Sequence, residues 1–202
     1  MRSVEIMSSL TTVGAAAGVR RSARYTSLMR QSILLPILFL SSIGVLAQSA
    51  AGLKWTAPAG WKSEGALPMR AATYTIAPSA GDKANAECAV YFFGAGQGGS
   101  VEANLDRWKS QFQASGGKPA VAQIATRTTR GLTMTTIDTS GDYSGMGGPM
   151  AAGQRRVPGY RLLGAIVQGP GGNIFIKFTG PAKTIAANKQ KFEQLLASFQ
   201  RG

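Results

Sequence analysis

The segment LLGAIVQGPGGNIFIKFT, residues 162–179, decides the fold of this chain. Two apolar runs, residues 162–167 and 173–179, flank residues 168–172, which consist mainly of glycine with one proline. Short β-prone runs joined by such turn residues are typical of a β-hairpin. Apolar residues occupy both faces of the first run, so we expect this hairpin to lie inside a sheet that is covered on both sides.

The same double-sided pattern recurs at residues 88–93. Cys88 and Val90 point to one side of a strand, whereas Tyr91 and Phe93 point to the other, so this strand is also expected to be central. Alternating or threonine-rich composition predicts three further strands, at residues 70–76, 121–128 and 132–139. Because most of the connections are short, we expect the strands to pair antiparallel.

Apolar side chains at helical spacing predict a helix over residues 100–115. Ser100 suits its N-cap, and Gly116 and Gly117 are expected to end it. Its apolar stripe consists of Val101, Leu105, Trp108 and Phe112. A second helix is expected to begin at Pro181, which suits a first turn. Its apolar side consists of Ile185, Phe192, Leu196 and Phe199. The elements together predict a mixed α/β (α+β) fold, a three-layer α/β/α sandwich with a mostly antiparallel central sheet and two main helices.

Residues 1–47 are predicted to be a leader that ends in a secretory signal peptide. The apolar run SILLPILFLSSIGVLA, residues 32–47, follows Arg30 and ends in small residues. A positive region, an apolar region and small residues at the cleavage positions define a signal peptide in this order. A membrane-spanning helix needs about 20 predominantly apolar residues, whereas this run is shorter and is interrupted by Pro36.

Cleavage is expected after Ala47, with Ala51 as the alternative. A second open point is the start of translation, because Met29 would be an ordinary first residue for such a signal. Residues 48–202 then have the length of a single domain. We therefore expect an exported protein, periplasmic or extracellular, with no membrane span after cleavage.

The residue inventory restricts the chemistry that the chain can perform. Histidine is absent, and Cys88 is the only cysteine. Ser-His-Asp and Cys-His hydrolysis, a histidine general base and histidine-ligated zinc are thereby excluded, as is an internal disulfide. Cys88 lies in an apolar strand and is expected to be a buried core residue. No catalytic residue, cofactor or metal is predicted, and a non-catalytic role is favoured over an enzyme.

The chain is strongly basic, with 22 basic and 9 acidic residues and a formal net charge of +13. Such a surface attracts anionic partners. The positive residues are scattered and lack interleaved aromatic residues, so no specific nucleic-acid site is predicted. The expected partner is an unknown envelope protein or an anionic surface.

A glycine-rich connection precedes the first predicted helix. Gly94, Gly96 and Gly99 fit the pattern G-x-G-x-x-G between a strand and a helix. No acidic residue follows in residues 119–130 to bind a ribose, so a dinucleotide site is not predicted. A tight connection is the simpler interpretation. The alternative is a contact for an anion or other ligand at Gly96, Gly98, Gly99 and Ser100.

Residues 141–159 are the longest stretch without periodicity and are rich in glycine and methionine. Loops of this length in a small domain are either functional or flexible. Methionines beside arginines form adaptable contact surfaces. The candidate partner contacts are therefore Met146, Met150, Arg155 and Arg156, with plain flexibility as the alternative.

Short motifs at both ends of the domain resemble PsbP-like domains. Residues 55–61, WTAPAGW, are similar to the Pro-x-Gly-Trp opening of these domains, and residues 179–199 are similar to their final helix. Residues 87–99 and 104–112 resemble an uncharacterised branch of small exported bacterial proteins. The resemblance spans residues 53–200. It implies the fold given above and an extracytoplasmic binding or assembly role, mostly without enzymatic activity, and it supplies no site residues.

The sequence thus favours an exported, non-catalytic binding or assembly module of the cell envelope. Two alternatives stay open. One is an envelope hydrolase of unknown substrate that uses serine, lysine or carboxylates in a cleft beside residues 94–100. The other is a lipid- or glycan-binding protein with a cavity between sheet and helix. A cluster of pKa-perturbed groups in a deep pocket favours an enzyme, whereas a shallow basic or apolar patch favours binding.

Overall fold

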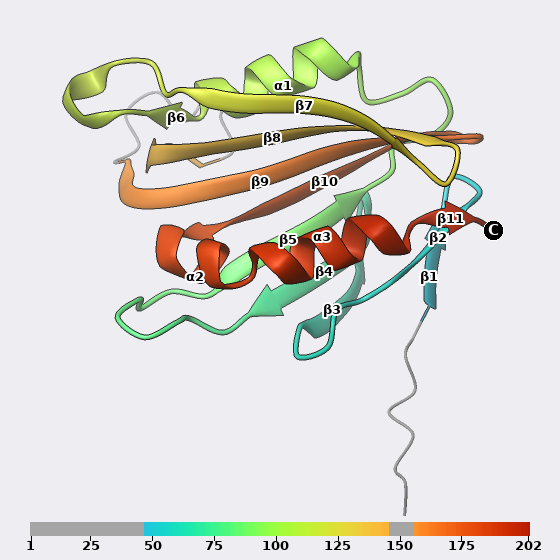
Figure 1. Ribbon diagram of the computed structural model, residues 1–202, viewed down its shortest axis with the longest axis horizontal. Coiled ribbons are helices and arrows are strands. Elements are labelled where there is room, and N and C mark those ends of the chain that lie inside the picture. Colours follow the sequence, from blue (N-terminus) through green and yellow to red (C-terminus); the bar gives the residue numbers. More distant parts are fainter. Residues whose placement is uncertain (1–46, 146–155) are drawn as a thin grey trace, which may run out of the picture. The chain divides into compact units, whose positions relative to one another are not determined.

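The structure is a computed structural model that describes residues 47–145 and 156–202, and an antiparallel sheet of eight strands dominates it (Figure 1). Its strands are β3 (Lys62–Leu67), β4 (Arg70–Ile76), β5 (Ala86–Tyr91), β6 (Phe112–Gln113), β7 (Ala122–Thr129), β8 (Leu132–Tyr143), β9 (Val157–Gly169) and β10 (Gly172–Pro181). The strand order is β3-β4-β5-β10-β9-β8-β6, and β7 also pairs with β8. The predicted hairpin is confirmed as β9 and β10, and β5 is an interior strand as expected.

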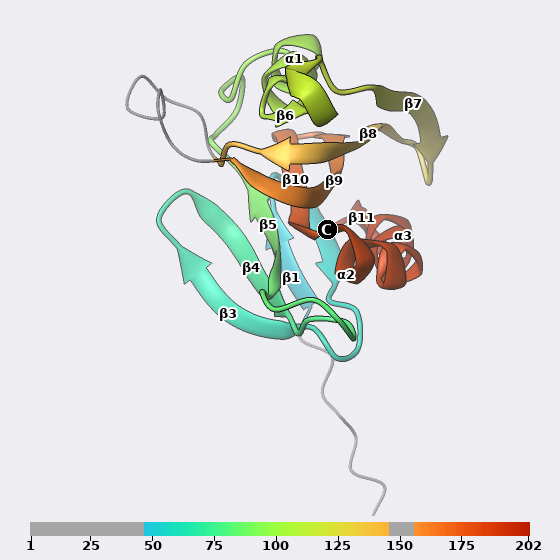
Figure 2. The ribbon, with the colours of Figure 1, turned by 90° about the vertical axis from the view of Figure 1, so that its left-hand side faces the viewer.

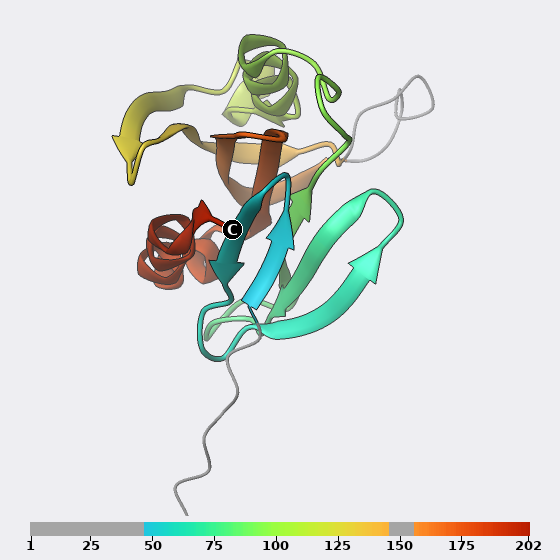
Figure 3. The same cartoon turned by 90° about the vertical axis from the view of Figure 1, so that its right-hand side faces the viewer.

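A second, small sheet joins the two ends of the described domain (Figure 3). It consists of β1 (Ala47–Ala50), β2 (Leu53–Thr56) and β11 (Gln200–Arg201). Trp55 on β2 stacks on Phe199 with ring centroids 5.1 Å apart, and both side chains are fully buried. The C-terminal segment is therefore part of the core that surrounds β2.

Helices α1 (Val101–Ser110) and α3 (Lys189–Ser198) pack against opposite faces of the large sheet (Figures 1 and 2), and the short α2 (Ala182–Ala187) precedes α3. Alternation along β10 explains the two cores. Phe175 belongs to the cluster that contains Trp108 of α1, whereas Ile176 belongs to the cluster that contains Phe192 of α3. Within the described ranges, no helix has the length and apolar character that crossing a membrane requires.

The mixed α/β class and the antiparallel sheet are confirmed. The finer description, a three-layer α/β/α sandwich, stays a prediction, because strands make up most of the domain and a second sheet is present. The predicted signal peptide lies in residues 1–47, of which residues 1–46 are outside the described part of the chain.

The first helix is shorter than predicted. It ends at Ser110, and Phe112 lies in β6, where it pairs with Tyr143 of β8 and is buried. The backbone N–H of Ser144 donates to the Gln111 carbonyl at 3.0 Å. Sheet pairing therefore overrides the helical spacing of Phe112. The two glycines expected to end the helix lie instead in a 3-10 turn, Ser115–Gly117.

The predicted second helix is divided into α2 and α3 at Asn188. The Asn188 amide donates to the Thr184 carbonyl at 3.0 Å, and Trp61 Nε1 donates to Asn188 Oδ1 at 3.2 Å. These contacts hold Asn188 at φ −105° and ψ 8°, outside the helical range. The break between α2 and α3 thus coincides with a hydrogen bond from the distant Trp61.

Candidate functional site

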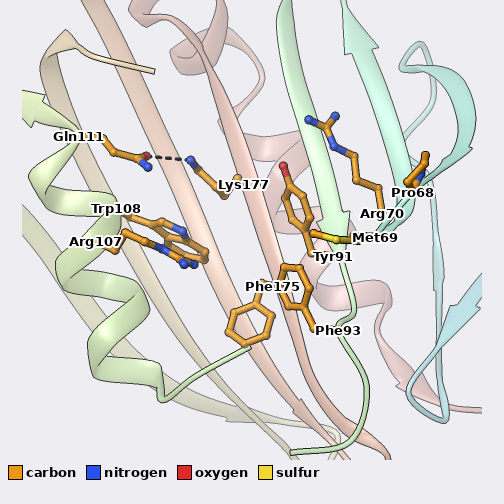
Figure 4. Close-up of a pocket in the computed structure, with 10 residues that line it drawn as sticks. All are labelled: Pro68, Met69, Arg70, Tyr91, Phe93, Arg107, Trp108, Gln111, Phe175 and Lys177. Atoms are coloured by element: carbon orange, nitrogen blue, oxygen red, sulfur yellow. Dashed lines mark hydrogen bonds between the residues drawn. The ribbon is translucent and has the colours of Figure 1, made fainter. Parts of the chain in front are cut away.

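A pocket of about 360 Å³ opens between α1 and strands β4, β5 and β10 (Figure 4). The sheet register brings its floor together, because Phe175 of β10 lies opposite Tyr91 of β5, which in turn lies opposite Arg70 of β4. The lining residues are Pro68, Met69, Arg70, Tyr91, Phe93, Arg107, Trp108, Gln111, Phe175 and Lys177. The pocket therefore combines an aromatic wall with three basic side chains.

Trp108 forms the α1 side of this pocket, where it packs against Gly164 of β9. A Cβ atom built at Gly164 would lie 2.7 Å from Trp108 Cζ3 and 2.7 Å from Ile137 Cγ2, closer than real contacts allow. Glycine at this position lets the indole pack directly on the sheet, where Trp108 is 2% exposed. The wall is thus held by tight packing.

Lys177 is the most unusual residue of the site. Its side chain lies on the α1 face of β10, the residue is 9% exposed, and its Nζ donates to Gln111 Oε1 at 2.8 Å. Burial, together with the positive charges of Arg107 and Arg70 and against the opposing charge of Glu87, lowers the pKa of Lys177 to about 8. A buried amine in this state can bind an anion or, once deprotonated, act as a nucleophile.

Gln111 is held in place for this contact by its own backbone. Its carbonyl accepts from Ser144 N at 3.0 Å, from Ser144 Oγ at 3.2 Å and from Arg156 Nη1 at 3.3 Å. Arg156 Nη1 also donates to the Asp142 carbonyl at 3.2 Å. Arg156, one of the candidate partner contacts, therefore joins the end of α1 to β8. The other three, Met146, Met150 and Arg155, lie outside the described residues.

A smaller cavity of about 190 Å³ adjoins the first and shares Arg70, Tyr91 and Lys177 with it. Burial raises the pKa of Tyr143 to about 12 and also raises the pKa of Tyr91, so both phenols are neutral at physiological pH. The Thr179 hydroxyl, which also lines this cavity, is buried and makes no hydrogen bond within the described residues. The adjoining cavity thus places neutral hydroxyl groups beside the charged side chains of Arg70, Glu87 and Lys177.

The basic side chains of the site differ in their partners. Arg70 forms an ion pair with Glu87 at 3.0 Å and lies over the Tyr91 ring at 5.4 Å. Arg107 donates to the neutral Asn104 amide, and Lys177 donates to the neutral Gln111 amide. Among the described residues, neither Arg107 nor Lys177 has an acidic partner.

The glycine-rich loop borders this pocket. Gly98 lies against two of its walls, because a Cβ there would be 2.6 Å from Phe175 Cε2 and 2.8 Å from Phe93 Cδ2. Ser100 caps α1 by accepting from Ala103 N at 3.1 Å, and Asn104 Nδ2 donates to the carbonyls of Gly98 and Ser100 at 2.8 Å each. The loop is therefore fixed by packing and capping, and ligand contact at Gly96, Gly98, Gly99 and Ser100 stays a prediction.

Cys88 and Asp138, two residues with reactive or acidic side chains, do not line this pocket. Cys88 is fully buried on the opposite face of β5, and burial raises the pKa of its thiol, so it is a core residue as predicted. Asp138 binds Arg161 at 2.6 Å and Lys189 at 3.4 Å. In the part of the chain that the structure describes, no three acidic or cysteine side chains group together as metal ligands.

The sequence predicts a cavity between sheet and helix as one alternative, but it does not identify the residues that line this pocket. They come from four segments far apart in the chain, and only the glycine loop beside them was a candidate. One signal was present in the sequence, a single lysine between Ile176 and Phe178 in an otherwise apolar strand. Lysine is rarely buried, so its position in a central strand marks an unusual environment.

No family model matches the sequence, and no curated protein matches it. Two solved structures are similar in fold. The solution structure of cyanobacterial PsbP (CyanoP) from Synechocystis sp. PCC 6803 is 14% identical and covers 83% of this chain and 99% of that chain, with a TM-score of 0.45. The crystal structure of PA94 from Pseudomonas aeruginosa, a protein of unknown function, is 9% identical and covers 76% of this chain and 94% of that chain, with a TM-score of 0.42. A PsbP is thus among the structures that this chain resembles, as its sequence motifs predict, and the likeness concerns the fold.

Proposed function

We propose that this protein is an exported, non-catalytic binding module of the cell envelope, and that the pocket between α1 and β10 holds its ligand. The observation that carries the proposal is the buried Lys177 at the base of a pocket with aromatic walls. Pockets that bind small molecules are mostly apolar and contain a few well-placed polar groups. Among the binding roles considered from the sequence, a ligand cavity between sheet and helix therefore agrees best with this pocket.

The three tryptophans provide a direct test by NMR. Trp108 lines the pocket, whereas Trp55 and Trp61 belong to the core on the other face of the sheet. When the protein is screened against small apolar acids, alcohols and amides, binders are expected to shift the Trp108 indole N–H signal and to leave the other two unchanged. If every binder shifts all three signals equally, or if none shifts Trp108, the pocket is not the ligand site.

An enzyme is the second candidate, because the pKa of Lys177 near 8 is the kind of perturbation that activates amines. The residues that line the two cavities include no serine, and their one carboxylate, Glu87, is paired with Arg70, so a Ser-Lys hydrolase has no support there. The remaining chemistry is imine formation, in which the amine attacks a carbonyl and water leaves.

Borohydride trapping separates these two functions. The protein is incubated with pyruvate or glyoxylate and sodium cyanoborohydride, and modified lysines are identified by peptide mass spectrometry. A binding module is expected to show no preference for Lys177 over exposed lysines such as Lys118. Rapid, selective labelling of Lys177 would support the enzyme and contradict the non-catalytic proposal.

A further inference from the structure

Lys177 and Arg107 both line one pocket, and no acidic residue of the described chain forms an ion pair with either of them. Glu87, which lines the adjoining cavity, is already bound to Arg70. Burying a positive charge beside other positive charges is costly unless an anion compensates it. The arrangement therefore favours an anionic ligand over a neutral or cationic one.

We infer that the ligand is a small organic anion whose carboxylate lies between Lys177 and Arg107 and whose apolar body packs against Phe93, Trp108 and Phe175. This inference rests on the proposed function and names its ligand class. Lys177 and Arg107 can each donate a charge-assisted hydrogen bond to a carboxylate. Lys177 Nζ donates to Gln111 in the free protein and retains two further N–H groups for this purpose when protonated.

The size of the pocket limits the apolar body. A volume of about 360 Å³ lies near the lower end of the roughly 300–1,000 Å³ found for ligand pockets. A small aromatic acid fits beside Trp108 and Phe175, whereas a long acyl chain would extend beyond the pocket. The geometry thus favours a compact acid over a membrane lipid.

Binding is expected to depend on pH through Lys177. The charged or titratable groups around its amine are Arg107 of α1, Arg70 of β4, Glu87 and Tyr91 of β5, and Tyr143 of β8, whose ring centroid lies 6.0 Å from Nζ. The pKa values of both tyrosines are raised, so Lys177 is the group of this set that changes charge near pH 8. The anion favours the protonated amine, so affinity is expected to fall about tenfold between pH 7 and pH 9.

The test is an NMR titration of the purified protein with 3-phenylpropionate, its neutral analogue 3-phenylpropionamide, and palmitate as the lipid-derived carboxylate. We expect 3-phenylpropionate to shift the Trp108 indole signal and to bind at least tenfold more tightly than either other compound. Lys177→Met is expected to weaken its binding roughly ten- to hundredfold and to abolish the pH dependence. Lys118→Met, which changes an exposed lysine outside the pocket, is expected to have no effect.

Arg107 is exposed and donates to Asn104, and Arg107→Gln keeps an N–H donor at this position while it removes the charge, so it provides a second variant. It is expected to weaken binding of the anion and to leave binding of the amide unchanged. If the amide binds as tightly as the acid, or if both variants bind the acid normally, the anion inference is wrong while the pocket proposal stands. If palmitate binds most tightly, the compact-acid assignment is wrong. If none of the three compounds shifts Trp108, both proposals fail.

Discussion

Asn104 links the glycine-rich loop to the pocket through its two amide atoms. Its Nδ2 donates to the carbonyls of Gly98 and Ser100, and its Oδ1 accepts from Arg107. Asn104 is itself 2% exposed, so these bonds form in a protected environment where a lost partner is costly. Asn104 therefore joins the glycine-rich loop to α1 and to Arg107, and ligand contact at the loop itself stays a prediction.

Gly98 and Gly96 provide a matched pair for testing this role. Both have positive φ, 91° and 69° respectively, but a Cβ at Gly96 meets no atom within 4 Å, whereas one at Gly98 meets Phe175 and Phe93. Gly96→Ala is expected to lower the free energy of unfolding by about 1–2 kcal/mol through backbone strain alone. Gly98→Ala is expected to cost about 1–3 kcal/mol more because it overpacks the aromatic contact.

Urea denaturation of the two variants and the native protein measures this difference. Equal losses of stability in both variants would show that the loop does not pack on the pocket walls. A larger loss for Gly96→Ala than for Gly98→Ala would contradict the described geometry directly.

At the scale of elements, β1 distinguishes the two proposed cleavage positions. Gln48 lies in β1 and pairs with Trp55 of β2. Its Oε1 accepts from the Tyr74 hydroxyl at 2.5 Å, and that hydroxyl accepts from Trp55 Nε1 at 3.0 Å. Cleavage after Ala47 retains this chain of hydrogen bonds, whereas cleavage after Ala51 removes β1 and the acceptor of Tyr74. The loss of one such acceptor costs about 1–3 kcal/mol.

We therefore expect the exported protein to begin at Gln48. Intact-mass and N-terminal peptide analysis of the protein recovered from the envelope fraction gives its first residue. A mature chain that begins at Gly52 would contradict this expectation, and a chain that retains residues 1–47 would contradict the proposed signal peptide.

Individual elements also show what the sequence could reveal. Strand β4 has the bounds that alternation predicts, residues 70–76. A strand with one buried face needs apolar residues at alternate positions, so its own sequence indicates its environment. Asn188, at the break between α2 and α3, binds Trp61, which lies 127 residues away, and β6 pairs with Tyr143 of β8. Contacts between residues so far apart produce no periodic pattern in the local sequence. The lining of the pocket could not be predicted for the same reason, since Arg70, Arg107 and Lys177 come together only in the folded chain.

For the molecule as a whole, Lys177 predicts how stability changes with pH. Its pKa is about 8 in the folded protein against 10.5 for an unperturbed lysine, so the unfolded state binds more protons between these values. The free energy of unfolding is therefore expected to rise by about 2 kcal/mol between pH 7 and pH 9.5. Denaturation curves at both pH values measure this change, and Lys177→Met is expected to abolish it. A stability that is flat or falls over this range in the native protein would contradict the burial of a charged amine.

The fold buries the Lys177 amine in a pocket that it shares with Arg70 and Arg107, and the proposed occupant of this pocket is an organic anion. The most direct measurement is an NMR titration of the Lys177 side chain, assigned by comparison with Lys177→Met, with and without saturating 3-phenylpropionate. We expect a pKa of about 8 for Lys177 in the free protein and a clear rise when the anion is bound. A pKa near 10.5 that does not change with the anion would show that the amine is neither buried nor in contact with the ligand.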